Sequence, residues 1–200
     1  MRLASFGVGA VSAGLDEVGR GCIAGPVVAA AVVLDSANPI SGLKDSKKLS
    51  ISKRILLANE IQQKAISWSI GRADAEEVDH LNILQASLTA MTRAHRMLET
   101  HTDIALVDGN QAPPLDCPVE TIVGGDDLID SISAASILAK VYRDREMMIA
   151  HELFPHYGFD KHMGYPTKMH ILALDEFGPC DLHRMSFAPV AKIIRKRASI

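Results

Sequence analysis

Short apolar runs along the first two thirds of the chain have the pattern of β-strands. Val11 to Val18 and Val27 to Leu34 are rich in Val, Ala and Leu. The second run is continuously apolar, which predicts a strand buried on both faces. Ser67 to Ala73 alternates polar and apolar residues, and two shorter apolar runs, Asp103 to Asp108 and Val119 to Val123, complete the predicted strands.

Segments with helical periodicity lie between and after these strands. Ser50 or Ser52 can cap a helix whose apolar residues form one stripe (Ile51, Ile55, Ala58, Ile61, Ala65). A second helix is expected over roughly Ile83 to Glu99, and a long one from about Leu128 to Leu153.

The end of the chain combines turn residues with one more helical pattern. Pro155 and Gly158 are expected to end the long helix, and Tyr157 to Pro166 predicts a structured loop rich in Gly, aromatics and His. Thr167 can cap a helix that stops near Gly178. The whole pattern predicts one α/β domain over residues 1–200. A mixed central sheet flanked by helices would occupy residues up to about 155, followed by a small helical C-terminal region over about 156–200.

Composition narrows the class of protein. Hydrophobic residues make up 48% and charged residues 22%, as in a globular chain with a core. The net charge of -3 counts mildly against nucleic-acid binding. Basic residues nevertheless gather in two places, which serve either as nucleic-acid contacts or as solvated faces (Lys44, Lys47, Lys48, Lys53 and Arg54; Lys192, Arg195, Lys196 and Arg197).

The three cysteines and the apolar runs bear on the location of the protein. The cysteines lie far apart and form no C-x-x-C motif, which argues against a disulfide framework and fits a reducing compartment. The run from Cys22 to Leu34 is too short to span a membrane. We therefore expect a cytoplasmic protein without membrane attachment.

Acidic residues stand at or just after the ends of three predicted strands. Asp16 and Glu17 close the first, Asp108 closes the DIALVD strand, and Asp126 follows the run that ends at Val123. Each such ending is by itself a common turn signal. Together they can converge at one edge of the sheet, where like charges would repel unless a cation joined them. Oxygen ligands without cysteine suit Mg²⁺ or Mn²⁺, and two such ions about 4 Å apart are an arrangement used for phosphodiester cleavage.

The adjacent acids Asp16 and Glu17 pose a geometric difficulty. On a regular strand, neighbouring side chains point to opposite faces. Both reach one site only if the strand ends, twists or bulges there, which the flanking Gly14 and Gly19 would allow.

The Gly19-Arg20-Gly21 segment admits two interpretations. A dinucleotide-binding loop is excluded, because the next element is predicted to be a strand and not a helix. Paired glycines also allow a backbone to approach a nucleic-acid sugar and phosphate. A simple hairpin turn explains the same residues equally well.

Several other residues have a plain structural alternative beside a functional one. Tyr165, between Gly164 and Pro166, is a candidate either for loop packing or for ligand contact. Lys140 and Asp144 form an i,i+4 pair that can simply bond to itself. The remaining candidates, considered for zinc binding or nucleophilic catalysis, lack the spacing of a zinc site or of a nucleophile turn, and structural or substrate roles are preferred (His162, His170, His183, Ser136).

Taken in order, the motifs of this sequence resemble those of ribonuclease HII, the type 2 ribonuclease H family of bacteria. The resemblance extends nearly from end to end. It includes G-L-D-E-V-G-R-G at 14–21, D-S-K-K-L-S at 45–50, N-I-L at 82–84, V-D-G-N at 107–110, G-D at 125–126, S-A-A-S-I-L-A-K-V-Y-R-D at 133–144, Y-G-F at 157–159, H-M-G-Y-P-T at 162–167 and H-R-M-S-F-A-P at 183–189.

The resemblance implies a fold, a reaction and a set of residues. The sheet would be ribonuclease H-like, with a small helical C-terminal region. Four carboxylates would bind two Mn²⁺ or Mg²⁺ ions and carry catalysis (Asp16, Glu17, Asp108, Asp126). The remaining residues would contact the substrate strand, its phosphates or the sugar at the ribonucleotide (Gly19, Arg20, Gly21, Ser46, Lys47, Asn82, Tyr165). The substrates would be RNA–DNA hybrids and DNA duplexes with embedded ribonucleotides, cut on the 5′ side to leave 5′-phosphate and 3′-hydroxyl, by a monomer.

The chain departs from the family pattern at two positions. Cys22 stands where the family commonly has Pro, and Gly124 where it commonly has Lys. The second change removes a positive charge beside the expected metal site.

Two functions compete with this one. The first is a catalytically inactive nucleic-acid-binding module of the same fold, and the second is a phosphotransfer enzyme that acts on DNA alone.

Overall fold

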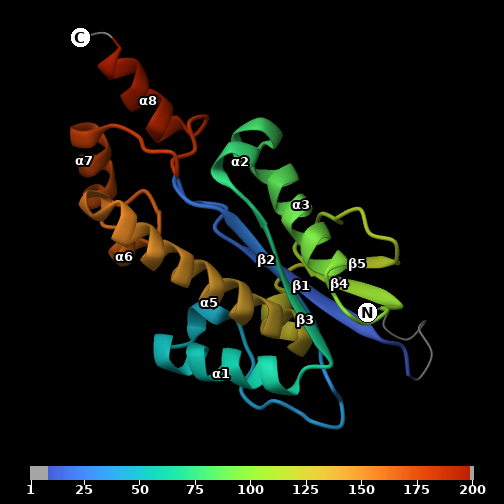
Figure 1. The fold of residues 1–200 in the computed structure, drawn as a ribbon. Coiled ribbons are helices and arrows are strands. Elements are labelled where there is room, and N and C mark those ends of the chain that lie inside the picture. The colour runs from blue at the N-terminus through green and yellow to red at the C-terminus, as the bar shows by residue number, and fades with distance from the viewer. Residues whose placement is uncertain (1–8, 199–200) are drawn as a thin grey trace.

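The computed structural model describes residues 9–198, which form a five-stranded sheet in the order β3-β2-β1-β4-β5 with helices on both faces (Figure 1). β1 pairs antiparallel with β2 and parallel with β4, while β2–β3 is antiparallel and β4–β5 is parallel. The sheet is therefore mixed, as predicted. The strands are β1 (Ser12–Val18), β2 (Val27–Val33), β3 (Ser67–Ala73), β4 (Ile104–Asp108) and β5 (Val119–Ile122).

Two layers of helices cover the sheet. α3 packs on one face against Leu15, Val27 and Ala29, whereas α1 and α5 pack on the other against Val28 and Ala30. All seven residues of β2 are buried, which confirms the prediction of a strand covered on both faces. The helices on these faces are α1 (Ile51–Lys64), α2 (Ala75–Leu81), α3 (Ile83–Arg96), α4 (Gly125–Leu128) and α5 (Asp130–Leu153).

The first turn of α5 lies directly against β1. A Cβ built on Gly14 would come within 2.1 Å of the Ser131 carbonyl carbon. Only glycine lets the helix approach the strand this closely. The close approach brings the start of α5 to the strand that carries Asp16.

Helix boundaries differ from the sequence predictions in three places. The long helix predicted from about Leu128 to Leu153 is α5, which begins at Asp130, and the extended backbone of Ile129 separates it from the short helix α4, which was not predicted. The helix predicted over Ile83 to Glu99 already ends at Arg96. α2 was not predicted; Asp74 and Glu77 form a capping box that stabilises this short helix despite its weak periodicity.

The C-terminal region is helical, and it packs on the far end of α5. The predicted loop from Tyr157 to Pro166 contains the end of a 3-10 turn and a short helix, so it is more regular than expected. Tyr157 and Phe159 stack with ring centroids 5.4 Å apart and pack against Met147 of α5. The elements are η3 (Pro155–Tyr157), α6 (Phe159–His162), α7 (Lys168–Phe177) and α8 (Ala188–Arg197).

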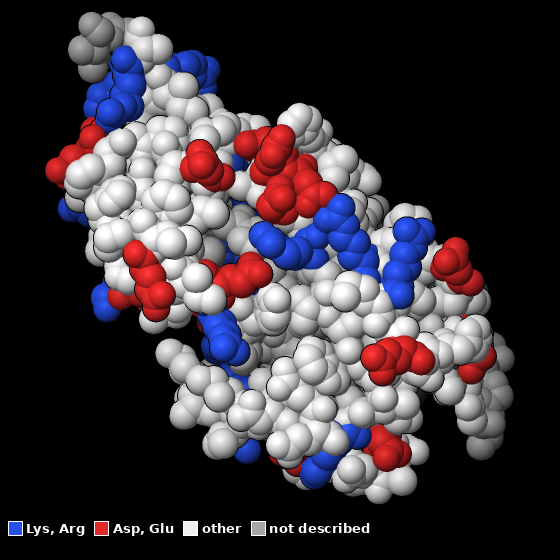
Figure 2. Space-filling model, in the orientation of Figure 1, with Lys and Arg blue, Asp and Glu red and all other residues white. Residues whose placement is uncertain are grey.

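The surface carries mixed charge. Figure 2 shows basic and acidic side chains in small separate groups, with a basic group on α8 at the top left. Within α8, Lys196 pairs with Asp175 of α7 at 2.7 Å, so part of this basic cluster holds the two helices together. Within residues 9–198, no helix is both long and apolar enough to cross a membrane.

Candidate active site

Three of the predicted carboxylates come together where the parallel strands β1 and β4 end. Leu15 pairs with Val107, so the next residues, Asp16 and Asp108, follow on neighbouring strands. Asp126 lies in α4, and the backbone amide of Gly125 donates to Asp108 Oδ1 at 2.8 Å. This bond ties the short helix to the end of β4. The carboxyl ends of adjacent parallel strands thus gather acids from distant parts of the sequence.

Asp16 and Glu17 reach this edge from opposite faces of the sheet. The pairing of β1 with β2 continues without a bulge from Gly14 to Val18, so the bulged or ended strand considered from the sequence is not found. Asp16 faces α5, where the Ser136 hydroxyl bonds to it and lowers its pKa. Glu17 lies with Asp108 along a small hollow beside α3. The regular alternation of a strand therefore places the two acids on either side of the sheet edge.

The charge of Asp108 acts on both of these acids. Burial raises the pKa of Asp16 well above its usual range, and the charges of Glu17 and Asp108 add to that effect. Burial also raises the pKa of Glu17, the Arg20 guanidinium opposes the rise, and Asp108 adds to it. The pKa of Asp126 is raised by burial and by Asp108. The end of the sheet is thus a region of concentrated negative charge.

The donor set fits a hard divalent cation. The acids offer carboxylate oxygens only, the ligands that Mg²⁺ and Mn²⁺ prefer, and a cation would relieve the repulsion that raises their pKa values. Among residues 9–198, no three His, Cys, Asp or Glu side chains form a ready-made metal cage. Asp16 and Asp108 instead accept backbone hydrogen bonds, from Glu17 at 2.7 Å and from Gly125.

The turn formed by Ser46, Lys47 and Lys48 lies beside the carboxylates. Its 3-10 helix is capped by the Asp45 side chain, which accepts from the Lys47 amide at 2.9 Å. The Ser136 hydroxyl, which bonds to Asp16, lies 3.0 Å from the Ser46 hydroxyl. Burial lowers the pKa of Lys47, but the charges of Asp45, Asp16, Asp126 and Asp108 together outweigh this effect and raise it. Lys47 is thus a cation that faces the acidic site from outside the sheet.

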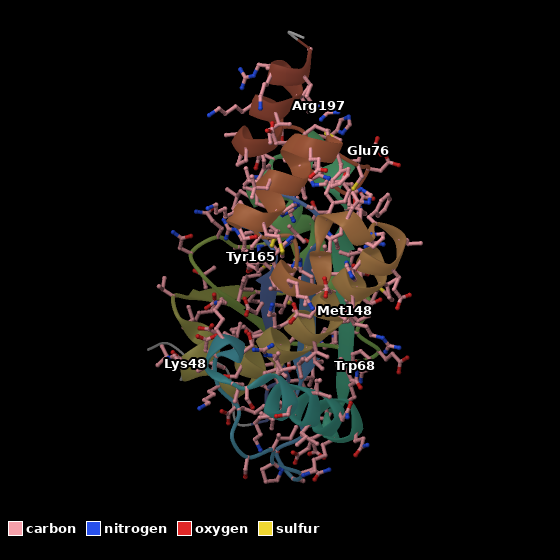
Figure 3. All side chains as sticks on the ribbon, turned by 90° about the vertical axis from the view of Figure 1, so that its left-hand side faces the viewer. Lys48, Trp68, Glu76, Met148, Tyr165 and Arg197 are labelled. Carbon is pink, nitrogen blue, oxygen red and sulfur yellow. The ribbon has the colours of Figure 1, made fainter. Side chains whose placement is uncertain are left out.

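The neighbouring Lys48 joins the turn to α4. Its ammonium group forms an ion pair with Asp127, the residue after Asp126. Figure 3 shows Lys48 on this turn, below Tyr165 on the same side of the molecule. Gly124, at the start of α4, has φ +70°, and open space surrounds the position that a Cβ would take. At position 124, where the resemblance leads us to expect Lys, no other residue occupies the space that the first carbon of the side chain would take.

The Gly-Arg-Gly segment is held by its carbonyl groups. The guanidinium of Arg184 is fully buried and donates to the carbonyls of Arg20 at 3.1 Å and Cys22 at 2.7 Å. Arg143, also fully buried, donates to Pro26 and Ala24. Two buried cations from α5 and from the C-terminal region thereby fix the path of this loop. Arg20 itself is exposed and pairs with Glu17 at 3.2 Å.

Tyr165 lies over the second glycine of this segment. A Cβ built on Gly21 would be 3.8 Å from the Tyr165 ring, and 38% of Tyr165 is exposed. Cys22 is buried beside it, with its thiol 3.5 Å from the Met163 carbonyl. The structure therefore brings together an open backbone and an exposed aromatic ring, which are 144 positions apart in the sequence (165 minus 21).

Asn82 caps the N-terminus of α3. Its side-chain oxygen accepts the backbone amides of Leu84 at 3.0 Å and Gln85 at 3.1 Å and so caps α3. With φ +66° and ψ 164°, its backbone lies in a region that only glycine adopts readily, so this cap is strained. Leu84 lines the hollow that contains Glu17. Asn82 thus sets the start of α3 at the edge of the site.

Sequence reasoning missed the buried arginines that organise these loops. Arg54 of α1 donates to the carbonyls of Ser46 at 2.9 Å and Leu49 at 3.1 Å and lies 3.6 Å from Asp144. The sequence places Arg54 in a basic cluster, where it looks like a solvated charge. Arg143 and Arg184 lie in motifs of the family resemblance, but their role was not predicted, because they bond to backbone carbonyls that lie far away in the chain. The predicted pair of Lys140 and Asp144 is confirmed at 2.6 Å.

Comparisons with known proteins agree with the architecture of this site. The model of the family described as ribonuclease HII matches residues 13–190. A ribonuclease HII from Dechloromonas aromatica (strain RCB) is 56% identical over 179 residues, which cover 90% of this chain and 91% of that protein. This chain belongs to the ribonuclease HII family. A ribonuclease HII from Nitrosococcus oceani is 55% identical over 182 residues, 91% of this chain and 90% of that protein.

Solved structures support the ribonuclease HII fold. Ribonuclease H2 from Pyrococcus horikoshii OT3 matches with a TM-score of 0.80 at 24% identity, over 94% of this chain and 99% of that one. Ribonuclease HII from Archaeoglobus fulgidus, solved in complex with PCNA, matches with a TM-score of 0.72 at 28% identity, over 88% and 95%. The predicted ribonuclease H-like α/β fold is confirmed. As a ribonuclease HII, the chain is a hydrolase, a nuclease of the ribonuclease H type that acts on RNA–DNA substrates.

Proposed function

We propose that this ribonuclease H hydrolyses the RNA strand of RNA–DNA hybrids and also cuts on the 5′ side of a single ribonucleotide embedded in DNA. The observation that carries the finer part is the position of Tyr165. Its exposed ring lies over Gly21, on the loop that follows Asp16 and Glu17. An aromatic ring beside an open backbone suits recognition of one sugar, whereas reading a long hybrid needs only repeated backbone contacts.

The proposed metal-binding residues are Asp16, Glu17, Asp108 and Asp126. The all-oxygen donor set and the raised pKa of three of these acids support two divalent cations, Mn²⁺ or Mg²⁺. A structural neighbour, Bst-RNase HIII, was solved in complex with Mn²⁺ and matches with a TM-score of 0.70 at 18% identity, over 99% of this chain and 74% of that one. When bound, the cations would supply activation of the attacking water and stabilisation of the leaving oxygen.

The protein's own residues would position the substrate around this centre. Lys47 faces the carboxylates and would pair with a phosphate of the cleaved strand, which fixes register and not sequence. The Ser46 hydroxyl, oriented by Ser136, would add a neutral contact. Gly21 would let the strand approach the loop, and Tyr165 would support the ribose. Hydrolysis by water would leave 5′-phosphate and 3′-hydroxyl, with the 2′-hydroxyl serving for recognition and not for attack.

The test uses three duplexes of one sequence: all DNA, DNA with a single ribonucleotide, and an RNA–DNA hybrid. Each is incubated with Mn²⁺, Mg²⁺ or EDTA, and the cut is mapped with wild type and with Asp16→Asn. We expect metal-dependent cleavage of the second and third duplexes, a nick 5′ of the ribose, and no cleavage by Asp16→Asn. Cleavage of the hybrid alone would refute the single-ribonucleotide proposal, and binding without cleavage would favour the inactive module.

A further inference from the structure

His170 and His183 form a chain of three buried hydrogen-bond contacts behind the loop that carries Tyr165. His170 Nδ1 is 2.9 Å from the Tyr165 carbonyl oxygen, and its Nε2 is 3.1 Å from His183 Nε2. His183 Nδ1 in turn accepts the backbone amide of Cys180 at 3.0 Å. His170 and His183 are 0% and 1% exposed. The contacts therefore connect the C-terminal segment to the Tyr165 backbone without reaching solvent.

The hydrogen-bond partners assign a tautomer to each ring. A carbonyl only accepts, so His170 must carry its proton on Nδ1 and leave Nε2 bare. His183 must then donate from Nε2, which leaves its Nδ1 free to accept from Cys180. Burial lowers the pKa of both rings to about 4, so both are neutral near pH 7. One direction of donation runs from Cys180 through both rings to Tyr165.

A third histidine holds the other side of the same turn. His162 Nδ1 accepts the Gly164 amide at 3.2 Å, and its Nε2 lies 2.9 Å from the Tyr157 carbonyl. The rings of His162 and His170 stack with centroids 4.2 Å apart. Met163 and Gly164 both have positive φ, at +49° and +82°. Such a backbone is costly for Met and persists only where surrounding contacts determine it.

We propose that His170 and His183 are positioning residues for Tyr165 and thereby determine how well the enzyme selects a single ribonucleotide. Tyr165 precedes Pro166, so its backbone is already confined to extended conformations, and a hydrogen bond to its carbonyl further restricts rotation about ψ and thereby the position of the Cα–Cβ bond. The second partner of that carbonyl, the Thr167 amide at 2.8 Å, is local to the turn. His170 alone connects the carbonyl to the protein core among the hydrogen bonds found in residues 9–198. The inference rests on the role of Tyr165 in the proposed function.

Two substitutions at one position separate the two bonds of His170. His170→Asn keeps a donor near the place of Nδ1, so it retains the Tyr165 bond and loses His183. His170→Gln keeps an acceptor near the place of Nε2, so it retains His183 and loses Tyr165. Leu172→Gln, at a position of α7 that is 60% exposed, is the matched control for a change on the same helix.

The readout is the ratio of cleavage rates on a single-ribonucleotide duplex and on an RNA–DNA hybrid. We expect His170→Gln to lower this ratio by about ten- to a hundredfold, His170→Asn to lower it much less, and Leu172→Gln to leave it unchanged. In a Tyr165→Ala background, His170→Gln should lower the ratio no further. A purely structural role would instead reduce both rates equally, in step with the thermal midpoint of each variant.

Side-chain ¹⁵N NMR of the unliganded protein tests the hydrogen-bond chain without any substrate. The Nδ1–H tautomer at His170 and the Nε2–H tautomer at His183 are expected, and the opposite tautomers would overturn the proposal. If wild type shows no preference for a single ribonucleotide, the proposed function fails on the wild type alone. If wild type and Tyr165→Ala behave as expected but His170→Gln keeps the ratio, only the positioning proposal is overturned.

Discussion

Asp16 is the residue at which burial and charge conflict most directly in this protein. The residue is 6% exposed, and burial together with the charges of Glu17 and Asp108 raises the pKa of its carboxyl group. A raised pKa in the folded state means that the free energy of unfolding falls as pH rises through that pKa. Without metal, ionisation of this acid therefore lowers the free energy of unfolding.

Asp16→Asn should consequently separate stability from activity. We expect cleavage to fall to background, while the thermal midpoint in EDTA rises, by about 2–4 °C for each kcal/mol gained. Adding Mn²⁺ should raise the midpoint of the wild type and leave that of the variant nearly unchanged, because a ligand stabilises only the state that binds it. Calorimetry with and without Mn²⁺ measures both effects. A variant less stable than wild type in EDTA would contradict the account.

The two glycines of the Gly-Arg-Gly segment should respond differently to alanine. Gly19 has φ +98°, and an added Cβ would lie 2.8 Å from the Pro26 carbonyl oxygen. Gly21 has no such constraint, and its Cβ would make an ordinary contact with the Tyr165 ring. Gly19→Ala should lower the free energy of unfolding by at least about 1–2 kcal/mol. Gly21→Ala should change it by less than about 0.5 kcal/mol but raise KM, because the methyl group occupies space proposed for the substrate strand. Urea unfolding and steady-state kinetics on both variants decide, and equal loss of stability would contradict this distinction.

At the scale of elements, Arg54 connects α1 to the turn that carries Ser46 and Lys47. Its guanidinium donates to two carbonyls of that turn and lies 3.6 Å from Asp144 of α5. Arg54→Met keeps the length of the side chain and removes every donor. We expect a loss of at least about 2 kcal/mol in the free energy of unfolding and a higher KM for the hybrid. Met148→Gln, at an exposed position of α5, is a control for which neither change is expected. Unchanged KM in a folded Arg54→Met protein would show that the turn does not need this support.

Helices and strands were predictable where the pattern of apolar and polar residues in the segment shows which of its faces is buried. β3 matches the predicted Ser67 to Ala73, and Ser50 caps α1 as one of the two expected residues. α2 was not predicted, because its seven residues are too few to show a helical periodicity of apolar positions. Asp74 and Glu77 nevertheless have the sequence spacing of a capping box. α4 was not predicted either, because its four residues are too few to show a periodicity.

The four carboxylates were predicted from strand ends together with the family motifs, and the supporting residues were not. An acid at the end of an apolar run is visible in the sequence. By contrast, Arg143 and Arg184 act on carbonyls more than 100 residues away, and a backbone carbonyl has no sequence signature. The roles of Arg20, Ser46, Lys47 and Tyr165 toward the substrate remain predictions.

At the scale of the whole molecule, two groups of titrating residues oppose each other in the dependence of stability on pH. His170 and His183, with pKa values lowered to about 4, bind protons in the unfolded chain at a higher pH than in the folded one. Between their unfolded pKa near 6.5 and their folded pKa, the free energy of unfolding therefore rises with pH. The raised pKa values of Asp16, Glu17 and Asp126 have the opposite sign, because the folded protein holds those protons to a higher pH.

Removing one member of each group should change the slope of stability against pH in opposite directions. His183→Gln retains a donor toward His170 but no longer titrates, so the slope between about pH 4 and 6.5 should fall, by at most about 1.4 kcal/mol per pH unit. Asp16→Asn removes an opposing group, so the slope should become steeper over the part of this range in which the Asp16 carboxyl titrates. Urea unfolding in EDTA at half-unit steps of pH measures both slopes. Parallel curves for wild type and His183→Gln would mean that His183 is already protonated in the folded protein, and its Nδ1 could then not accept the Cys180 amide as assigned.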